Sequence, residues 1–486
     1  MANRLIYLVG TDGRLPPGAG DVRVAGITAD SRAVKPGFVF AALPGTKVDG
    51  AKFIPQAIAQ GASAIVVQAG HYEGPGLVIE SDNPRRLYAL MAARLAGPQP
   101  DNIVAVTGTN GKTSVAAFVR QIWSALGFRA ASLGTIGVVG PSGAQYLSHT
   151  TPDPIELHRI AADLKADHVD HLAIEASSHG LDQFRLDGLR LSAGAFTNLT
   201  RDHMDYHATE QAYFDAKMRL FEELLPKGAP AVINVDAPHG AEAAARARKA
   251  GLALYTVGRK GEHLTLLDDA REGMVQVLTL RTARGVHRVS LPLAGEFQAA
   301  NALVAAGLVL ATGGEEAQVL HALQSLRGAP GRLEQVGQTA QGGAVFVDYA
   351  HTPDALDNAI LALKPYATGR LTVVFGCGGD RDRGKRPQMG AIAARLAQRV
   401  IVTDDNPRTE DPAAIRAEIL AAAPGAEDIA DRAAAIRAGV TGLGAGDILL
   451  VAGKGHEPGQ TVGTEVRPFS DHAAVRAALA GEDYHG

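Results

Sequence analysis

Short apolar runs alternate with stretches of helical periodicity along most of the chain. In the first segment, strand-like runs at 38–43, 64–67 and 77–79 alternate with a helical stretch at 54–60. The pattern stops at Gly97-Pro98-Gln99-Pro100, which has the composition of a linker. These positions predict a small α/β domain over residues 1–98.

A buried strand opens the next segment and runs into a glycine-rich loop. The strand is predicted at 102–106, and a helix follows from about Lys112 to Leu126, closed by Gly127. Further strands are predicted at 172–174, 194–197 and 231–234, with helices between them. This alternation predicts a parallel sheet through about residue 330, with a small antiparallel insertion at 263–292.

A second break at 327–331 precedes another alternating segment. Its strands are predicted at 345–347, 371–375, 400–403 and 448–451, which favours a doubly wound, Rossmann-like domain. We therefore expect an α/β protein of three domains, over residues 1–98, 99–330 and 331–486. A length of 486 residues suits several hydrophobic cores rather than one.

Composition and charge restrict the classes of function. Hydrophobic residues make up 46% and charged residues 20%, and the net charge of -4 gives no electrostatic case for binding nucleic acid or a membrane surface. The single cysteine, Cys377, can form neither an intrachain disulfide nor a multi-cysteine metal site. No secretory apolar region opens the chain, and no run reaches the roughly 18 apolar residues of a membrane span. We expect a soluble, cytoplasmic monomer.

A phosphate-binding loop is the strongest motif. It follows the strand at 102–106 and consists of Gly108, Thr109, Asn110, Gly111, Lys112, Thr113 and Ser114. Backbone N–H groups at the start of a helix bind phosphates, with Lys112 on the β/γ oxygens and the Thr113 hydroxyl on Mg²⁺. The alternative is an ordinary turn with a solvated lysine, but the strand before the loop and the helix after it both favour ATP binding.

Acidic and imidazole side chains follow the next two predicted strands. Glu175 comes after 172–174, and His203 comes after 194–197. Because the carboxyl ends of neighbouring parallel strands face one crevice, both are candidate Mg²⁺ ligands. Taken singly, such a residue is more often solvated or capping.

Lys217 falls on the apolar face of a helix predicted at 210–225. At about 100° per residue, it lies near the middle of an arc that includes Tyr213 and Phe221. Its ammonium group either reaches past that face to water or meets the metal and phosphate site. The spacing leaves both readings open.

The phosphate loop departs from the general GxxxxGK[ST] pattern, since Val106 stands where the first glycine would be. This TGTNGKT form resembles the Mur ligases and the related folylpolyglutamate synthetases, which activate a carboxylate as an acyl phosphate that an amine then attacks. The segment 213–221 is similar to the Mur-ligase helix whose lysine is carbamylated by CO₂. The resemblance implies Lys112, Lys217, Glu175 and His203 as catalytic residues, and Thr113, Glu175, His203 and carbamylated Lys217 as Mg²⁺ ligands.

Further motifs extend the resemblance over essentially the whole chain. It implies that a nucleotide-linked dipeptide, UDP-MurNAc-L-Ala-D-Glu, is bound by Ser31, Thr46, Lys47, Val48, Thr150, Thr151, Ser177, Gln183 and Arg185. It implies further ATP contacts by Asn301, Arg332, Asp348 and His351, while Gln298 stands where relatives often carry Asn. Since Arg332, Asp348 and His351 belong to the third domain, we expect the site to form fully only on domain closure.

Three polar loops follow predicted strands of the third domain, at 376–387, 404–408 and 453–457. We expect them to converge at the carboxyl edge of the sheet, although any one alone would pass for a charged surface loop. The resemblance implies that they bind the incoming amino acid through Arg381, Asp405, Asn406, Pro407, Arg408, Gly453 and Glu457.

The run Asp405-Asn406-Pro407-Arg408 is similar to that of family members that use meso-diaminopimelate. Arg408 can pair with the distal carboxylate of that amino acid and Glu457 with its distal ammonium, whereas L-lysine would leave the arginine unpaired. The resemblance thus implies an ATP-dependent ligase that adds meso-diaminopimelate in cytoplasmic peptidoglycan precursor synthesis. The alternatives are the same ligase using L-lysine, a folylpolyglutamate synthetase, a P-loop kinase or NTPase, and a non-catalytic nucleotide-binding module.

Overall fold

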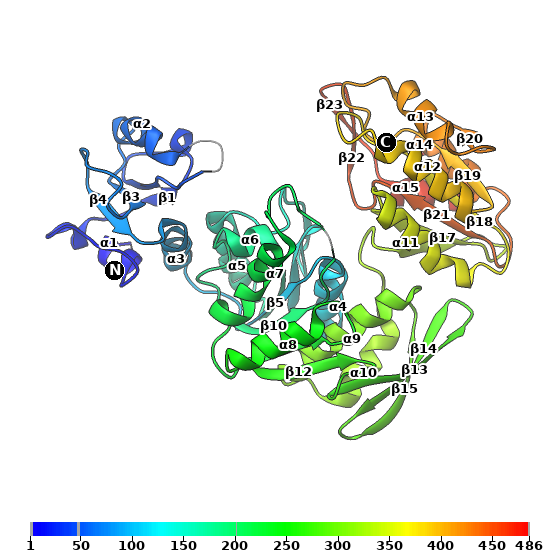
Figure 1. Ribbon diagram of the computed structural model, residues 1–486, viewed down its shortest axis with the longest axis horizontal. Coiled ribbons are helices and arrows are strands. Elements are labelled where there is room, and N and C mark those ends of the chain that lie inside the picture. The colour runs from blue at the N-terminus through cyan, green and yellow to red at the C-terminus, as the bar shows by residue number, and fades with distance from the viewer. Residues whose placement is uncertain (1–2, 46–48, 201, 485–486) are drawn as a thin grey trace. The chain divides into compact units, whose positions relative to one another are not determined.

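The computed structural model describes residues 3–45, 49–200 and 202–484, and the chain divides into two compact units. The first unit comprises Met1–Thr265 and Leu303–Val319, and the second comprises Leu266–Ala302 and Leu320–Gly486. Each of the three expected α/β segments contains a sheet of its own (Figure 1). The α/β class is therefore confirmed, while the expected boundaries near residues 98 and 330 stay predictions.

The amino-terminal sheet of the first unit is parallel, in the order β1-β2-β3-β4. Alternate residues of β2 enter two different cores, because successive strand side chains point to opposite faces. Val39 packs with α1 and α3, whereas Phe40 packs with α2. The elements are α1 (Leu5–Val9), β1 (Gly26–Thr28), β2 (Phe38–Ala41), α2 (Ile54–Ala59), β3 (Ala64–Gln68), β4 (Val78–Ser81) and α3 (Pro84–Ala96).

The central sheet carries the phosphate loop. Its parallel strands lie in the order β12-β11-β10-β5-β9-β6, and the antiparallel β7 and β8 continue it beyond β6. Helices α5 to α8 contribute to one core, with Ile103 and Ala105 of β5, while α4 packs against β6 and β9. The strands are β5 (Asn102–Thr107), β6 (Ala130–Gly134), β7 (Gly137–Gly140), β8 (Gly143–Gln145), β9 (His171–Glu175), β10 (Leu191–Phe196), β11 (Pro230–Asn234) and β12 (Ala253–Gly258). The helices are α4 (Lys112–Ala125), α5 (Pro154–Ala166), α6 (Ser178–Asp182), α7 (Glu210–Arg219) and α8 (Gly240–Lys249).

The helix expected at 210–225 changes character before its end. Helix α7 begins where the Thr209 hydroxyl accepts from the Ala212 N–H, and it continues as a π-helical turn over Leu220–Leu224. The wider turn lets the consecutive residues Leu220 and Phe221 both enter the core, where each is fully buried.

The carboxyl-terminal sheet belongs to the second unit and has the order β16-β17-β21-β18-β19-β20. Only β16 is antiparallel to its neighbour. Helices α11 to α13 share one core with the sheet, and α14 and α15 share another, which is the doubly wound arrangement expected from the sequence. The elements are β16 (Glu334–Gln338), β17 (Ala344–Asp348), α11 (Pro353–Leu363), β18 (Leu371–Phe375), α12 (Lys385–Leu396), β19 (Arg399–Val402), α13 (Pro412–Leu420), β20 (Glu427–Asp428), α14 (Arg432–Val440), β21 (Ile448–Ala452) and α15 (Asp471–Ala480).

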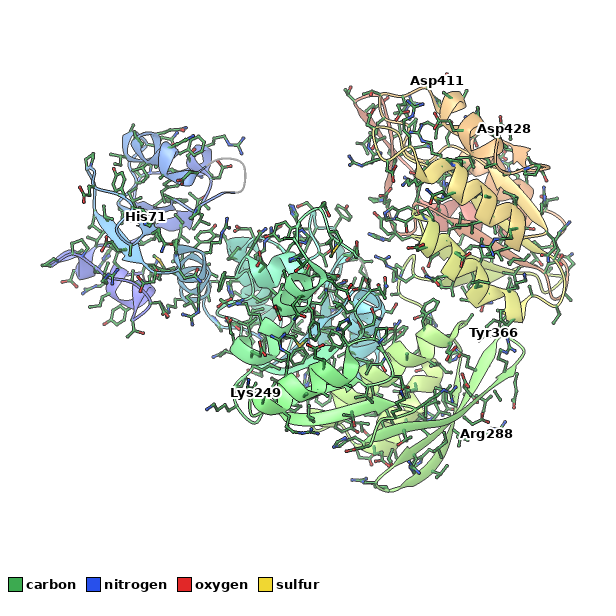
Figure 2. All side chains as sticks on the ribbon, in the orientation of Figure 1. His71, Lys249, Arg288, Tyr366, Asp411 and Asp428 are labelled. Carbon is green, nitrogen blue, oxygen red and sulfur yellow. The ribbon has the colours of Figure 1, made fainter. Side chains whose placement is uncertain are left out.

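Two hairpins complete the second unit. Strands β14 (Val275–Thr282) and β15 (Gly285–Leu291) are antiparallel, which confirms the expected insertion; Arg288 lies on β15 (Figure 2). Strands β22 (Gly459–Val462) and β23 (Glu465–Pro468) form the other hairpin. The remaining strand and α-helices each have residues in both units: β13 (Leu264–Glu272), α9 (Glu296–Ala311) and α10 (Glu316–Ala322). Across the part of the chain that is described, every helix is too short or too polar to cross a membrane.

Candidate active site

The phosphate loop lies between β5 and α4 and is held by the segment that follows β10. Thr109 N–H donates to the Asn198 carbonyl over 2.9 Å, and Asn110 N–H donates to the Asn198 side chain over 3.0 Å. Gly108 has φ +143°, and a Cβ atom there would lie 1.9 Å from the Thr197 hydroxyl. The loop can therefore approach β10 this closely only with glycine at position 108.

Lys217 is buried beneath this loop rather than reaching past the apolar face to water. Its side chain is 1% exposed, its ammonium donates to the Gly108 carbonyl over 2.8 Å, and it lies 4.1 Å from the centre of the Tyr213 ring. Lys112 donates to the same carbonyl over 2.9 Å. Burial, reinforced by the charge of Lys112, lowers the pKa of Lys217 well below its ordinary value.

Glu175 ends β9 beside the first turn of α4. Its carboxylate accepts from the Thr113 hydroxyl over 3.0 Å and from the Thr135 N–H over 2.8 Å, and its side chain is buried. The expected convergence of strand ends thus brings Glu175 to the phosphate loop. The paired oxygens of Thr113 and Glu175 suit Mg²⁺, which prefers oxygen ligands.

His203 lies in a cluster of aromatic rings with His179 and Tyr213. Its ring centre is 4.9 Å from that of His179 and 6.0 Å from that of Tyr213. Burial, together with His203 and His207, lowers the pKa of His179. Among the described residues, no three His, Cys, Asp or Glu side chains are grouped to hold a metal ion, so the expected ligand set stays a prediction.

The residues expected to bind the dipeptide form a connected network beside Glu175. Thr151 donates its hydroxyl to the Glu175 carbonyl over 2.8 Å and contacts the Ser177 hydroxyl at 3.0 Å. Arg185 donates to the Thr151 carbonyl over 2.6 Å and to the Gln183 amide oxygen over 2.8 Å. Thr150 lies 3.0 Å from the Thr135 hydroxyl, which itself donates to Glu175.

A cavity of about 250 Å³ lies next to this network. Gln183 and Arg185 line it together with residues of the amino-terminal segment, Arg85 and Tyr88 among them. The other lining residues are Leu43, Ser148, His149, Asp153, Pro154 and Glu156. The cavity therefore combines cationic, carboxylate, hydroxyl and apolar groups, and residues of both the amino-terminal segment and this network line it.

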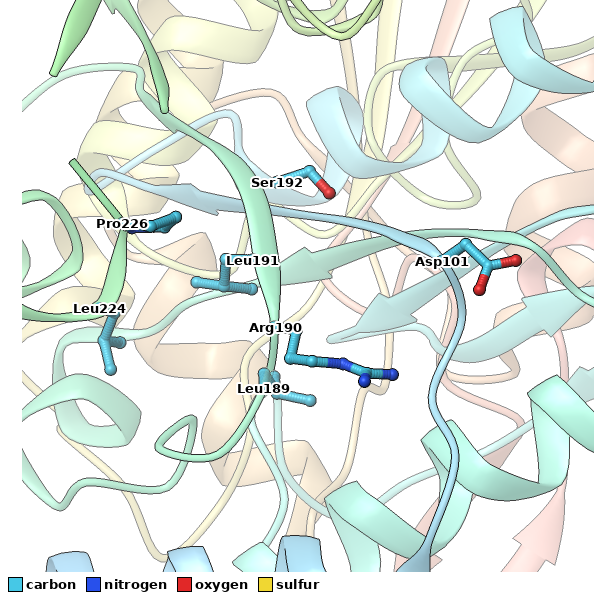
Figure 3. A pocket seen from close by; sticks show the side chains of 7 residues that line it. All are labelled: Asp101, Leu189, Arg190, Leu191, Ser192, Leu224 and Pro226. Atoms are coloured by element: carbon cyan, nitrogen blue, oxygen red, sulfur yellow. The ribbon is translucent and has the colours of Figure 1, made fainter. Parts of the chain in front are cut away.

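A larger cavity, of about 540 Å³, does not coincide with any predicted site residue. Leucine side chains line it with Asp101 and Arg190 (Figure 3). It lies at the amino ends of β5 and β10, whereas the phosphate loop follows the carboxyl end of β5. The larger cavity and the phosphate loop therefore lie at opposite ends of β5.

The amino-terminal contacts are described only in part. Ser31 is buried and donates its hydroxyl to the Gln56 amide oxygen over 3.2 Å. Thr46, Lys47 and Val48 lie outside the described residues.

The expected ATP contacts of the second unit are linked to one another. Asn301 donates to the Gln298 side chain over 3.3 Å, and Gln298 donates to the Arg332 carbonyl over 2.9 Å. The Arg332 guanidinium lies 5.0 Å from the centre of the Tyr349 ring. The Asp348 carboxylate accepts from the Leu333 and Ala350 N–H groups over 2.6 and 2.8 Å. His351 follows three residues later, and its carbonyl accepts from Lys385 over 2.8 Å.

The three polar loops of the second unit converge, as expected. Arg408 donates to the Gly379 carbonyl over 2.8 Å, which joins the first loop to the second. Asn406 donates to the Glu457 carboxylate over 2.9 Å, which joins the second to the third. The neighbouring predicted residues are Asp405 and Pro407 beside these two, Gly453 near the Asp405 carboxylate, and the exposed Arg381.

Sequence reasoning missed two groups in the site. Thr135 directly follows β6, so the rule that found Glu175 at a strand end would also have found it. Lys454 is fully buried and donates to both Asn406 and Glu457 over 3.0 Å. Burial raises the pKa of Glu457, but the charge and hydrogen bond of Lys454, together with Asn406 and His456, bring it below its ordinary value.

Comparisons with known proteins point to one family, and their matches cover most of the chain. Family models match residues 23–95 (Mur ligase family, catalytic domain), 106–309 (Mur ligase middle domain) and 331–455 (Mur ligase, glutamate ligase domain). The UDP-N-acetylmuramoyl-L-alanyl-D-glutamate–2,6-diaminopimelate ligase of Brucella melitensis is 56% identical over 469 residues, 96% of each chain.

Solved structures of ligases from the same family are also similar to this chain. A structure of a UDP-N-acetylmuramoyl-L-alanyl-D-glutamate–2,6-diaminopimelate ligase is 32% identical, with a TM-score of 0.75 and 99% of each chain covered. The MurF ligase of Thermotoga maritima, solved in complex with ADP, is 17% identical with a TM-score of 0.59 over 94% of this chain and 97% of that one, and shows the shared fold.

Proposed function

Because the chain belongs to the Mur ligase family, we propose that it joins meso-2,6-diaminopimelate to the D-glutamyl γ-carboxylate of UDP-MurNAc-L-Ala-D-Glu. ATP phosphorylates the carboxylate to an acyl phosphate. The neutral amine of diaminopimelate attacks the acyl carbon, and the tetrahedral intermediate collapses to the amide and phosphate. The products are the nucleotide-linked tripeptide, ADP and phosphate, and the reaction takes place in the cytoplasm, where ATP is available and the lone Cys377 stays reduced.

The placement of Arg408 and Glu457 around Asn406 carries this proposal. Arg408 approaches the Asn406 carbonyl at 3.5 Å, while Glu457 accepts from the Asn406 side chain over 2.9 Å. A cation and an anion therefore flank one residue, as needed to bind the carboxylate and ammonium at the distal end of meso-diaminopimelate. L-Lysine has no carboxylate for Arg408, so the arrangement favours diaminopimelate.

The phosphate loop supports the ATP step. Its backbone N–H groups and Lys112 would hold the phosphates, and Asn301, Arg332, Asp348 and His351 would contact the nucleotide from the second unit. Thr113 and Glu175 would hold Mg²⁺ with His203, and the ion would supply compensation for the charge on the transferring phosphoryl group.

The buried amine of Lys217 supports carbamylation. Its low pKa favours the neutral amine, which is the form that reacts with CO₂. The carbamate would replace a buried cation, whose burial costs free energy, with an anion beside the metal site. Removing CO₂ and bicarbonate should then lower the activity, and adding bicarbonate should restore it. Full activity in rigorously CO₂-free buffer would contradict this part of the proposal.

One assay tests the reaction and its alternatives. Phosphate release and product mass are measured with ATP and UDP-MurNAc-L-Ala-D-Glu, adding meso-diaminopimelate, L-lysine or no amino acid. We expect release and a diaminopimelate mass increment only in the first case. An L-lysine increment would indicate the lysine-adding ligase, and release that ignores the amino acid would indicate an NTPase.

A further inference from the structure

A buried carboxylate joins two arginines from helices far apart in the sequence. Asp187 is 3% exposed, and both its oxygens accept from Arg219 of α7 over 2.8 Å. The guanidinium of Arg86 in α3 lies 3.2 Å from the same carboxylate. Because charges lose their hydration when they are buried, apolar side chains of similar volume often stabilise a core at least as well as such an ion pair.

Arg219 contacts the start, the middle and the end of the segment 181–187. It donates to the Leu181 carbonyl over 2.9 Å and stacks 3.9 Å from the centre of the Phe184 ring, besides its pair with Asp187. Phe184 has φ +59°, a left-handed conformation that costs free energy for a large side chain unless its surroundings hold it. A single guanidinium thus fixes a strained turn at three points.

This turn connects the residues on which substrate binding is proposed. It carries Gln183 and Arg185, which line the 250 Å³ cavity. Arg219 is two positions from Lys217 on α7, and it pairs with Glu223 toward the surface at 2.7 Å. Arg86 follows Arg85 on α3, and Arg85 and Tyr88 line the same cavity.

We propose that Arg219 and Asp187 form a clamp that positions Gln183 and Arg185 for the nucleotide-linked dipeptide and keeps them in register with Lys217, with Arg86 coupling the amino-terminal segment to it. These are positioning residues, since they act through their neighbours. The inference rests on the proposed function for the identity of the substrate. The geometry of the clamp does not depend on that identity.

Four variants test the clamp. Asp187→Asn keeps the shape but removes the charge, and Arg219→Met removes the guanidinium. Arg86→Ala removes the link between Asp187 and α3, together with the ion pair between Arg86 and Asp12 at 3.0 Å. Arg246→Met is the matched control, because Arg246 also pairs with α7 through Asp215, and with Glu222 at 2.7 Å, but none of its described contacts reaches 181–187.

The first measurement is the separation of kinetic constants. We expect Asp187→Asn and Arg219→Met to raise the KM for UDP-MurNAc-L-Ala-D-Glu about tenfold or more and to lower kcat up to about 100-fold, as ångström-scale misplacement does. The KM for ATP should stay within about twofold, because none of the contacts described for Asp187, Arg219 and Arg86 reaches the phosphate loop. Arg86→Ala should raise only the KM for the dipeptide substrate, and Arg246→Met should change neither constant.

The second measurement needs no substrate. Amide hydrogen exchange should become faster in peptides covering 181–187 in Arg219→Met and Asp187→Asn, but not in peptides covering 107–115. Unchanged exchange there would overturn the clamp, as would an equal rise in the KM values for ATP and the dipeptide substrate. An inactive wild-type protein would overturn the proposed function alone, since exchange would still judge the clamp.

Discussion

Lys112 and Lys217 donate hydrogen bonds to one acceptor, the Gly108 carbonyl, over 2.9 and 2.8 Å. Two ammonium groups this close repel each other, and Lys217 is the one cut off from water. The loop and α7 therefore destabilise the charged form of Lys217 together, while Lys112 keeps the position from which it can meet phosphate oxygens.

Lys217→Met is expected to raise the unfolding temperature of the ligand-free protein in CO₂-free buffer while abolishing ligase activity. The pKa of Lys217 is lower in the folded than in the unfolded chain, so the unfolded chain binds more protons between the two values. Wild-type stability should therefore rise with pH up to about 10.4, the ordinary lysine value, and the advantage of the variant should shrink as the pH rises toward that value. Calorimetric unfolding at several pH values measures this, and an advantage that stays constant with pH would contradict it.

The alternation of strands and helices was predictable because the central strands of each of the three larger sheets are parallel and helices that pack on the sheet connect them. The predicted bounds of the strand at 371–375 are the observed ones. The predicted bounds at 102–106 and 172–174 differ from the observed ones by at most one residue at either end. The π-helical turn at Leu220–Leu224 was not predictable, because it depends on how Leu220 and Phe221 share a tertiary core. Helical periodicity contains no signal for such a turn.

The site was predictable where a strand end or a loop motif fixed the position, as for Thr113 and Glu175. Periodicity placed Lys217 on the apolar face of its helix but left open where its ammonium group ends, and it gave no indication of the Gly108 carbonyl as its partner. Pairings across long sequence separations, such as Lys454 with Asn406 or Asp187 with Arg86, depend on tertiary packing that no local pattern encodes. For the same reason the clamp at Arg219 was not predictable from the sequence.

Gly108→Ala is expected to weaken ATP binding and to lower the unfolding temperature. Its Cβ would meet the Thr197 hydroxyl at 1.9 Å, so the loop must move away from β10, at a cost of roughly 1–3 kcal/mol. Gly143→Ala is the matched control, because Gly143 also has a positive φ of +117° but has nothing within 4 Å of the added atom. Calorimetric titration with ATP separates close approach from backbone strain, and equal effects of the two variants would refute the packing argument.

Arg408→Ala is expected to reduce kcat/KM for meso-diaminopimelate about 10- to 150-fold, as the loss of a hydrogen-bonded charge of roughly 1.5–3 kcal/mol implies. The KM for ATP should not change, and the preference over L-lysine should fall by a similar factor. Arg467→Ala serves as the control, because Arg467 lies on the neighbouring hairpin and pairs only with the exposed Glu465 in the described contacts. A variant that keeps the full preference for diaminopimelate would refute the role of Arg408.

Lys454→Met is expected to shift the acid limb of kcat/KM for diaminopimelate to higher pH. Burial alone would raise the pKa of Glu457, but Lys454, with Asn406 and His456, lowers it. The carboxylate therefore stays ionised at lower pH in the wild-type protein, and without Lys454 it should become protonated, and lose its hold on the distal ammonium, at a higher pH. Since Lys454 is fully buried, Lys454→Arg is a second variant that keeps the charge, and it should preserve the wild-type limb if it folds.

Lys364→Met changes an exposed lysine and controls for net charge. An acid limb that is the same in Lys454→Met and Lys364→Met would show that Lys454 does not set the ionisation of Glu457.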